Sequence, residues 1–586
     1  MEGESVMGDR MWTVDDDIST KYPIYTRGNV GEVFPDPVAP LSWTLMGRTG
    51  AEMGWRDAWV KTGAFDYEEF GNAGNVIVAV FGSYCYLNVS LARIFAVRTP
   101  GFTPEMMDQA LFGTMDGVPP YTALPTDADS EKEAALGATL GWVFTVQDFP
   151  EIEADAAATR ELRAKRPDFS TMSTDEVLDY GLHVMRSHFR ALFAAHLHTS
   201  FLATVPLGMV SGICEAIGQG PAAMTLTSGL GGVDSAAPSW AMWELGRVTA
   251  GSASLTAEFN AGVPGILARL QEKADRSDID ATEFLAGFTE FLVEFGSRGP
   301  NEWEMRSPTW ETNPEIALAA IERIRLAPND DSPQQRWETR VAEREALTPA
   351  LVAALAADPA TQGQFAAAIS AAGKFLPARE RTKTNIIRMV QESRIAFREW
   401  GRRLVDKGQL DEIEDFGLIE EEELAIARVD TAPLREKIRE RRAMMEMFAG
   451  LDPPFVLNGE TIHYDNWPKK DSRPIEIAKS GDLLTGLSGA PGTYTGRARV
   501  VLSAADPLAL EPGDVLIAPI TDPSWTPLFV PAGAVVVNVG AAASHAVIVS
   551  REIGLPCVVS VSDATRRIPD GAMITVDGSA GTVTIL

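Results

Sequence analysis

The stretch that decides the fold is Val537-Asn538-Val539-Gly540-Ala541-Ala542-Ala543-Ser544-His545-Ala546-Val547-Ile548-Val549. Its β-branched start predicts a buried strand, which leads through small residues to Ser-His at the start of an expected helix. Ser544 is of a residue type that caps helix N-termini. The free N–H groups and the dipole of a helix N-terminus favour an anion, and small residues allow a bulky group to approach the backbone. An imidazole placed there, that of His545, is suited to carry a phosphoryl group because its nitrogen is nucleophilic at neutral pH.

Short runs of β-branched residues lie on both sides of this stretch and predict a β/α domain. The runs are bounded by Gly, Pro and Asp, which is the pattern of short strands. They cover residues 498–502, 515–518, 534–539, 557–561, 573–576 and 582–586. One helix, from about Ser544 to about Gly554, interrupts them, so we expect residues 483–586 to form one compact domain. A capped helix with an incidental histidine is the other interpretation of the residues alone.

Residues 1–450 show the pattern of a mostly helical body. One stripe of apolar side chains at helical spacing indicates core packing, and it consists of Phe284, Phe288, Phe291, Leu292 and Phe295. Alanine-rich windows favour further helices, which Pro359 and Pro377 are expected to break. The first 75 or so residues are rich in Gly, Pro and Trp and are expected to be irregular.

The segment 451–482 is expected to be a linker or hinge, because closely spaced prolines interrupt any regular element there. The predicted fold class is therefore multidomain, with a mostly α-helical body and a C-terminal β/α domain. A length of 586 residues allows about four domain-sized units.

The charge of the chain restricts its partners. There are 81 acidic and 51 basic side chains, which gives a formal net charge of −30. Such a surface repels phosphate backbones and anionic lipid headgroups, so neither nucleic acid nor a membrane is expected as a partner. A small anion held in a local basic pocket is still compatible with this charge.

The cysteines and histidines give no sign of a metal site. Three widely separated cysteines form no disulfide framework, and the apolar runs are shorter than a membrane span, so we expect a cytoplasmic protein. Four of the six histidines fall in one predicted helix over residues 177–205, without the spacing of a ligand set. We interpret them as ordinary packing or surface residues and predict no metal site.

The sequence segments around His545 resemble the swivelling phosphohistidine domain of the PEP-utilising enzymes. The matching segments are 489–501, 521–529, 533–536, 544–546 and 551–559, in this order. The resemblance implies that His545 is the catalytic phosphoryl carrier and that Thr521, Gly540 and Ser544 support its site. Family members commonly have two glycines where this chain has Gly540-Ala541, and the added methyl group narrows the space beside the histidine.

Segments of the body also resemble this family, specifically the substrate-binding domain of rifampin phosphotransferase-type proteins. The matching segments are 25–41, 295–310 and 379–404. Arg27, Arg298 and Arg306 are the cations we expect near a transferring phosphoryl group, since guanidinium forks match phosphate oxygens. Glu32 or Glu302 is expected to orient an acceptor hydroxyl or to take its proton. For each of these residues a structural ion pair is the alternative.

The family's nucleotide domain is not recognisable in the sequence. The resemblance to the substrate domain starts at about residue 22, and no phosphate-binding Gly-x-x-x-x-Gly-Lys-Ser/Thr loop occurs. As in phenylphosphate synthase, the resemblance implies a separate ATP-grasp protein that phosphorylates His545, with Mg²⁺ bound there with ATP and no tightly bound organic cofactor on this chain.

The acceptor is expected to be a small hydroxylated molecule, either an aromatic or a terpenoid-like alcohol, because the body is apolar and contains Trp and Met. The chain is thus predicted to be a phosphotransferase, dikinase-like with a phosphohistidine intermediate, and one subunit of a split enzyme. Two alternatives stay open: a self-sufficient phosphotransferase with an unrecognised donor, and a non-catalytic ligand-binding or scaffold protein.

Overall fold

The computed structural model describes residues 14 and 17–586, except 72–73, 113–117, 330–331, 461, 471, 473, 505–509 and 542–543. The chain forms two compact units. Unit 1 comprises Met1–Phe201, Trp303–Arg306 and Thr382–Pro474, and unit 2 comprises Leu202–Glu302, Ser307–Arg381 and Ile475–Leu586. The helical body expected over residues 1–450 is thus divided between the two units, and most of its middle part folds with the C-terminal domain (residues 483–586).

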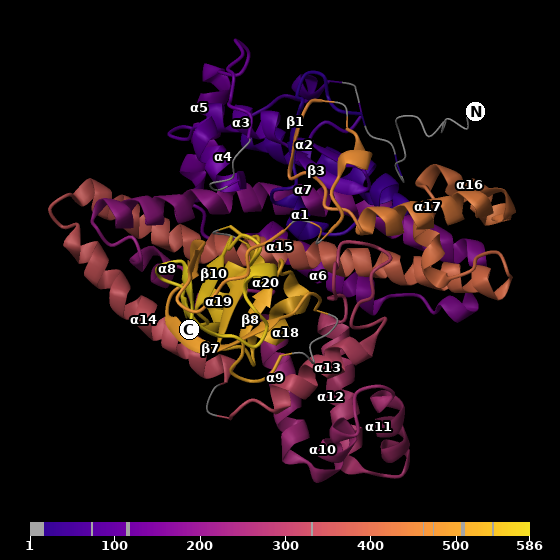
Figure 1. Ribbon diagram of the computed structural model, residues 1–586. Helices are drawn as coiled ribbons and strands as arrows, with labels where there is room; N and C mark the ends of the chain where they lie inside the picture. Colours follow the sequence, from indigo (N-terminus) through magenta and orange to yellow (C-terminus); the bar gives the residue numbers. More distant parts are fainter. Residues whose placement is uncertain are drawn as a thin grey trace. The chain divides into compact units, whose positions relative to one another are not determined.

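Unit 1 combines helices with a small antiparallel sheet of order β2-β3-β1-β4 (Figure 1). Its strands are β1 (Ile24–Thr26), β2 (Val78–Phe81), β3 (Tyr84–Asn88) and β4 (Val456–Asn458). Its helices are α1 (Val30–Val33), α2 (Glu52–Thr62), α3 (Val89–Arg98), α4 (Pro104–Phe112), α5 (Ser130–Val143), α6 (Pro150–Ala164), α16 (Leu424–Val429) and α17 (Arg435–Ala449). Parts of α7 (Thr174–Ala216) and α15 (Pro359–Asp406) complete it, because the unit boundary falls inside both helices.

Part of the predicted linker is built into unit 1. Leu457 in β4 pairs with Tyr25 in β1, and the buried Trp467 packs against Tyr84 and Phe448. Residues 461, 471 and 473 of the linker lie outside the described residues. The chain passes from unit 1 to unit 2 between Pro474 and Ile475, near the end of the segment 451–482.

The expectation of an irregular N-terminal segment is wrong for residues 42–62. A π-helix over Ser42–Ala51 continues directly into α2. Its glycines hid the helical pattern, yet each lies where an aromatic ring packs. A Cβ on Gly47 would lie 2.1 Å from the Trp43 ring, and one on Gly50 would lie 2.3 Å from the Phe189 ring.

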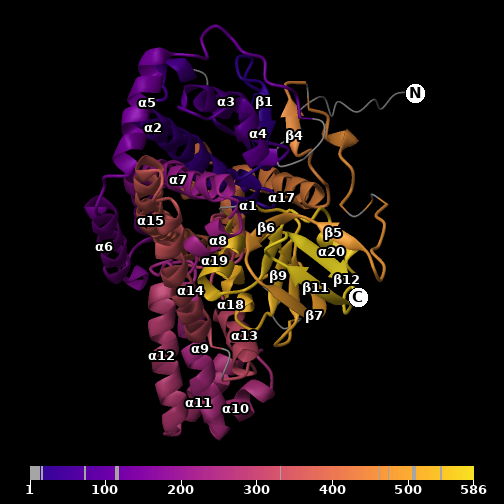
Figure 2. The same ribbon diagram turned by 90° about the vertical axis from the view of Figure 1, so that its left-hand side faces the viewer.

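The helices of unit 2 precede the C-terminal domain in sequence. They are α8 (Ala222–Leu226), α9 (Ala237–Gly251), α10 (Ala253–Asn260), α11 (Ile266–Asp275), α12 (Ile279–Phe295), α13 (Pro314–Arg325) and α14 (Pro333–Ala354). The predicted aromatic stripe lies on α12, where Phe284, Phe288 and Phe291 are core residues. Pro359 starts α15 as expected, but Pro377 lies inside that helix and does not break it. α10, α11 and α12 lie side by side in both views (Figures 1 and 2).

The C-terminal domain holds an eight-stranded sheet of order β5-β12-β11-β7-β8-β9-β10-β6. The strands are β5 (Leu483–Thr485), β6 (Leu487–Ala490), β7 (Thr493–Val500), β8 (Val515–Ala518), β9 (Ala534–Val537), β10 (Cys557–Val559), β11 (Met573–Asp577) and β12 (Thr582–Ile585). β7, β8, β9 and β10 run parallel, and the other pairs are antiparallel. All six runs predicted as strands correspond to β7–β12, and the predicted fold class is confirmed.

The central strands are buried on both faces. In β8, Leu516 and Ala518 belong to one hydrophobic cluster while Val515 and Ile517 belong to another. The first cluster includes residues of α18 (Thr526–Phe529) and α19 (His545–Ile553), and the second includes residues of α20 (Ala564–Arg567). Helices therefore cover opposite faces of the parallel strands, as such strands require (Figure 2).

α7 meets the criteria of length and composition for a membrane span, and 39% of its apolar window is buried. Its Val184 and Phe189 are buried in the core of unit 1, and its Val210 and Cys214 are buried as well. Interior helices of globular domains pass the same test, so this helix is weak evidence for a membrane. All three cysteines are free and buried. The cytoplasmic location stays a prediction.

A buried carboxylate joins α2 to β2, and its removal tests how the N-terminal part of unit 1 is held. Glu52 accepts hydrogen bonds from the amides of Ile77 (2.9 Å) and Val78 (3.0 Å) and pairs with Arg56 at 2.7 Å. Because Glu52→Ala leaves Arg56 and both amides without the carboxylate, we expect the free energy of unfolding of unit 1 to fall by about 3–5 kcal/mol. Hydrogen exchange at the amides of Ile77 and Val78 measures this loss.

Glu161→Ala is the control, because Glu161 and its partner Lys165 are both exposed. Slow exchange at Ile77 and Val78 in Glu52→Ala would show that the strand is held by other contacts.

Candidate functional site

The candidate site lies where three neighbouring parallel strands end. Thr521 follows β8, the segment from Gly540 to His545 follows β9, and Ser560 follows β10. The Ser560 hydroxyl donates a hydrogen bond to the Gly540 carbonyl at 2.5 Å, which joins two of these loops. Ligand sites of α/β sheets form at this edge, outside the carboxyl ends of the strands.

The imidazole of His545 is held by two threonines. The distance from Nδ1 to the Thr521 hydroxyl is 3.0 Å, and the distance from Nε2 to the Thr526 hydroxyl is also 3.0 Å. The Phe529 ring packs edge-on against it, with 5.8 Å between the ring centroids. Only 8% of His545 is exposed. Because a hydroxyl can donate or accept, this pair of contacts suits either neutral tautomer.

His545 is the first residue of α19, as expected, but Ser544 does not cap the helix with its side chain. Ser544 occupies the N-cap position, and its hydroxyl makes no capping hydrogen bond. The Ser544 Oγ atom is buried without a hydrogen-bond partner among the described residues. It lies beside Gly540, where an added Cβ would come within 3.0 Å of Ser544 Oγ and 2.9 Å of Val559 Cβ. Gly540 thus keeps space beside this hydroxyl, while Ala542 and Ala543 lie outside the described residues.

The helical part of unit 2 contacts the segment after β8 that carries the two threonines beside His545. The Ser239 hydroxyl on α9 donates to the Thr526 carbonyl at 3.2 Å. The Asn301 amide donates to Asp522 Oδ2 at 3.1 Å, and Asn301 itself adopts a left-handed conformation with φ of 53°. The sequence did not single out Ser239, Asn301, Asp522 or Thr526. Asn301, Asp522 and Thr526 lie in matching segments, and only the folded structure shows what they contact.

Arg298 and Glu302 bind each other in unit 2. Arg298 Nη1 lies 3.0 Å from one carboxylate oxygen of Glu302 and 3.2 Å from the other, and both side chains are buried. Trp310 donates its amide to the Arg298 carbonyl at 2.8 Å. The pair therefore stabilises the loop that carries Asn301. This is the structural ion pair that the sequence analysis gave as the alternative role of these two residues.

Arg27 and Glu32 lie in unit 1, at and beside α1. Arg27 Nη2 donates to the carbonyls of Phe34 (3.2 Å) and Pro35 (3.0 Å), and the guanidinium lies 4.5 Å from the Tyr84 ring centre. Arg27 Nη1 is buried without a hydrogen-bond partner among the described residues. Burial raises the pKa of Tyr84, and the Arg27 charge acts in the opposite direction. Arg27 therefore has spare hydrogen-bonding capacity for an anion.

Arg306 is also in unit 1 and binds neutral groups. Its Nε donates to the Glu414 carbonyl at 3.0 Å, and its Nη1 lies 3.4 Å from Met445 Sδ. Its own amide donates to Glu304 Oε1 at 3.0 Å. The structure therefore places Arg27, Glu32 and Arg306 in unit 1, and Arg298, Glu302 and His545 in unit 2.

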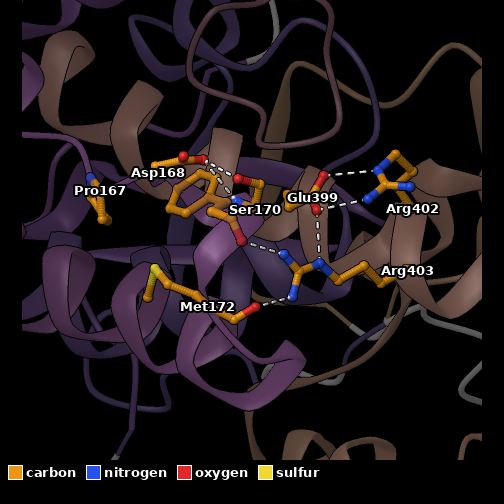
Figure 3. Close-up of a pocket in the computed structure, with 8 residues that line it drawn as sticks. Pro167, Asp168, Ser170, Met172, Glu399, Arg402 and Arg403 are labelled. Atoms are coloured by element: carbon orange, nitrogen blue, oxygen red, sulfur yellow. Dashed lines mark hydrogen bonds and ion pairs between the residues drawn. The ribbon is translucent and has the colours of Figure 1, made fainter.

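A hollow of about 670 Å³ lies elsewhere in unit 1 (Figure 3). Its two guanidinium groups are already bound. Arg402 pairs with Glu399 and Asp406, and Arg403 donates to Glu399 and to the carbonyls of Phe169 and Met172. None of the predicted site residues lines this hollow. Among the described residues there is also no group of three or more side chains suited to hold a metal ion.

An imidazole at a helix N-terminus, beside the ends of parallel strands, is suited to carry a phosphoryl group. Two segments of the chain match known families. Residues 510–581 match the mobile domain of PEP-utilising enzymes, and residues 188–380 match the fourth domain of rifampicin phosphotransferase. The resemblance to the PEP-utilising enzymes that the sequence indicates is thereby confirmed for these two segments.

Several curated proteins are similar to this chain. An uncharacterised protein of Mycobacterium tuberculosis is 26% identical over 584 residues, which is 98% of this chain and 62% of that protein. Rifampicin phosphotransferase of Streptomyces sviceus is 31% identical over 311 residues, which is 52% of this chain and 35% of that enzyme. The prodigiosin-synthesising transferase of Serratia marcescens is 29% identical over 306 residues, or 51% and 33% of the two chains. The chain thus spans about three-fifths of the first relative and about a third of the other two.

The different environments of the arginines lead to a prediction about stability. Arg298→Met leaves the Glu302 carboxylate buried without its partner, so we expect unit 2 to lose about 3–5 kcal/mol of unfolding free energy. Arg27→Met removes a half-buried side chain with neutral partners, so its cost should be about 1 kcal/mol. Urea unfolding followed by hydrogen exchange in each unit measures both values.

The double variant Arg298→Met/Glu302→Leu is the control, because it removes both charges together and should recover most of the loss. An equal loss of unfolding free energy in Arg298→Met and Arg27→Met would contradict the assignment of Arg298 to a structural role.

Proposed function

We propose that this chain is the carrier and acceptor-binding component of a phosphotransferase. His545 takes a phosphoryl group from a donor and passes it to a hydroxyl group of a small organic acceptor. The observation that supports this most is the placement of His545 at the N-terminus of α19, with a threonine hydroxyl on each ring nitrogen, inside a segment that matches the mobile domain.

The first half-reaction needs an unprotonated ring nitrogen. Its lone pair attacks phosphorus, an N–P bond forms, and the bond to the donor's leaving group breaks. The other ring nitrogen carries the proton during the attack and donates a hydrogen bond to a threonine hydroxyl, and this contact fixes the tautomer and the ring orientation. The spare hydroxyl of Ser544 and the first-turn N–H groups of α19 are suited to bind the phosphoryl oxygens.

In the second half-reaction the acceptor oxygen attacks phosphorus, the N–P bond breaks, and the hydroxyl proton leaves to a base. Glu302 is fully buried, whereas Glu32 is only half-buried, so Glu32 is the better candidate for that base. Arg27 and Arg306 are the better candidates to neutralise the phosphoryl charge, because both bind neutral groups and Arg298 does not. Transfer of this kind depends chiefly on positioning and charge neutralisation.

The donor in this proposal is ATP bound with Mg²⁺ by a separate ATP-grasp protein. The acceptor is an aromatic or terpenoid-like alcohol bound by the helical body. Two named relatives, the rifampicin phosphotransferase and the prodigiosin-synthesising transferase, support a small organic acceptor.

Intact mass spectrometry tests the proposed function. We expect the chain to gain one phosphoryl group when it is incubated with Mg²⁺–ATP and the ATP-grasp protein encoded beside it, and to gain none with Mg²⁺–ATP alone. His545→Ala should stay unlabelled in both cases.

Gain with ATP alone would instead support a self-sufficient phosphotransferase. No gain with any donor would support the non-catalytic alternative, and equal labelling of His545→Ala would overturn the assignment of the carrier.

The assignment of Arg27 can be tested without knowing the acceptor. We expect the chain to bind inorganic phosphate at this guanidinium, and Arg27→Met to weaken that binding about tenfold because two charge-assisted hydrogen bonds are lost. Phosphorus NMR titration of the full chain measures the dissociation constant.

Arg402→Met is the matched control, since Arg402 already pairs with Glu399 and Asp406. Phosphate affinity that falls equally in both variants would show that only the overall charge matters.

A further inference from the structure

α19 carries a second buried polar group, at the end opposite His545. Glu552 lies in its last turn and is only 2% exposed. Its carboxylate accepts one hydrogen bond from the Gly231 amide at 2.8 Å and another from the Leu230 amide at 3.0 Å. Both donors belong to the helical part of unit 2, in the connection between α8 and α9. One short helix therefore joins the candidate carrier histidine to a contact with the neighbouring helices.

The turn that receives Glu552 has a backbone shape that glycine makes possible. Gly229, Gly231 and Gly232 have φ angles of 58°, 75° and 67°. A Cβ on Gly229 would lie 2.9 Å from the Val341 amide nitrogen, so the turn also packs closely on α14. Arg344 on α14 donates to the Ser228 carbonyl at 2.8 Å and to the Gly229 carbonyl, and both contacts hold the turn. Successive amides of such a turn form a concave site for an anion, and Glu552 occupies it.

The neighbouring Arg551 does not neutralise Glu552. Its Nε donates to the Gly489 carbonyl at 2.8 Å, and its Nη1 lies 3.5 Å from the Thr227 hydroxyl. Burial lowers the pKa of Arg551 to about 10. The two charged side chains therefore reach different partners around the same connection between helices. α8, α14 and α19 lie together in both views (Figures 1 and 2).

The histidine end of α19 is closed in this arrangement. Both ring nitrogens contact threonine hydroxyls, and the Thr526 carbonyl is itself bound by Ser239 on α9. An in-line attack on a donor needs an accessible ring nitrogen. Because His545 is only 8% exposed and Ser239 on α9 binds the loop that holds its ring, we expect the C-terminal domain to leave the helices before His545 is phosphorylated. Apolar contacts such as those of Val233 and Ala236 with this domain stabilise the docked state but give little orientation. The carboxylate in the glycine turn supplies a directional contact.

We propose that Glu552, bound in the glycine turn 229–232, is a positioning residue that docks the C-terminal domain and sets the orientation of α19 and His545. This inference rests on the proposed function of His545 as a carrier. The docked state protects the histidine, and release of Glu552 from the turn accompanies its exposure to a phosphoryl donor.

Phosphoramidate, a small chemical donor, tests this without any partner protein. A ring nitrogen attacks its phosphorus, an N–P bond forms, the P–N bond of phosphoramidate breaks, and ammonia leaves with the ring proton. We expect His545 in Glu552→Ala to be labelled at least tenfold faster than in the natural chain, because two hydrogen bonds to a buried carboxylate are lost. Glu552→Gln keeps one acceptor oxygen and should give an intermediate rate. Mass spectrometry of the His545 peptide measures each rate.

Hydrogen exchange separates docking from general stability. In Glu552→Ala the amides of residues 228–232 and 545–553 should lose protection, while those of β11 and β12 keep theirs. Leu230→Pro removes one of the two donors from the other side of the contact and should reproduce the faster labelling. Glu511→Ala is the control, because Glu511 pairs with Arg497 at an exposed position of the same domain.

Unchanged labelling and unchanged exchange in Glu552→Ala would overturn the inference, as would loss of protection throughout the sheet. Failure of ATP and the ATP-grasp protein to label His545 would count against the proposed function alone, since neither phosphoramidate labelling nor exchange depends on them.

Discussion

The arrangement of the candidate site depends on the two hydrogen bonds that hold the His545 imidazole between Thr521 and Thr526. They require the loop after β8 to lie against the start of α19, and this follows from parallel strands that end at one edge of the sheet. They also tie the ring to the helices of unit 2, because the Thr526 carbonyl is bound by Ser239. One imidazole therefore links sheet geometry to the docking of the C-terminal domain.

Electrostatics adds a second constraint. A net charge of −30 opposes the arrival of any phosphoryl group, so binding has to come from local donors. The structure distinguishes the arginines in this respect. Arg298 is neutralised by a buried glutamate, whereas Arg27 and Arg306 are held by carbonyls and a thioether. A guanidinium held by neutral groups keeps its full charge for a ligand, and this is why the burial of a cation alone is a poor guide to its role.

Sequence patterns predicted the C-terminal domain well and the body only in outline. Strands such as β8 and β9 are short, β-branched and bounded by turn residues, so local signals suffice. The helix over residues 42–62 was not predicted because glycines are unusual inside helices, and Gly47 and Gly50 lie within it. They are glycines because the Trp43 ring packs against Gly47 and the Phe189 ring packs against Gly50. The i, i+4 spacing of Arg298 and Glu302 is compatible with an ion pair, but only the structure shows that the two side chains are buried together. The contact of Glu552 with Leu230 joins residues 322 positions apart and has no local signature.

The division of the chain changes how the proposed reaction has to be pictured. Residues 298–302 and Arg306 are close in sequence, yet the first belong to unit 2 and the second to unit 1. If Arg27, Glu32 and Arg306 receive the phosphoryl group, the carrier and the acceptor side belong to different units. The segment from Ser297 to Glu302 contacts Asp522, in the segment after β8, through Asn301 and continues directly into the unit 1 residues Trp303–Arg306. Asn301, which contacts Asp522, has a left-handed backbone and lies two residues before Trp303, the first residue of the unit 1 segment.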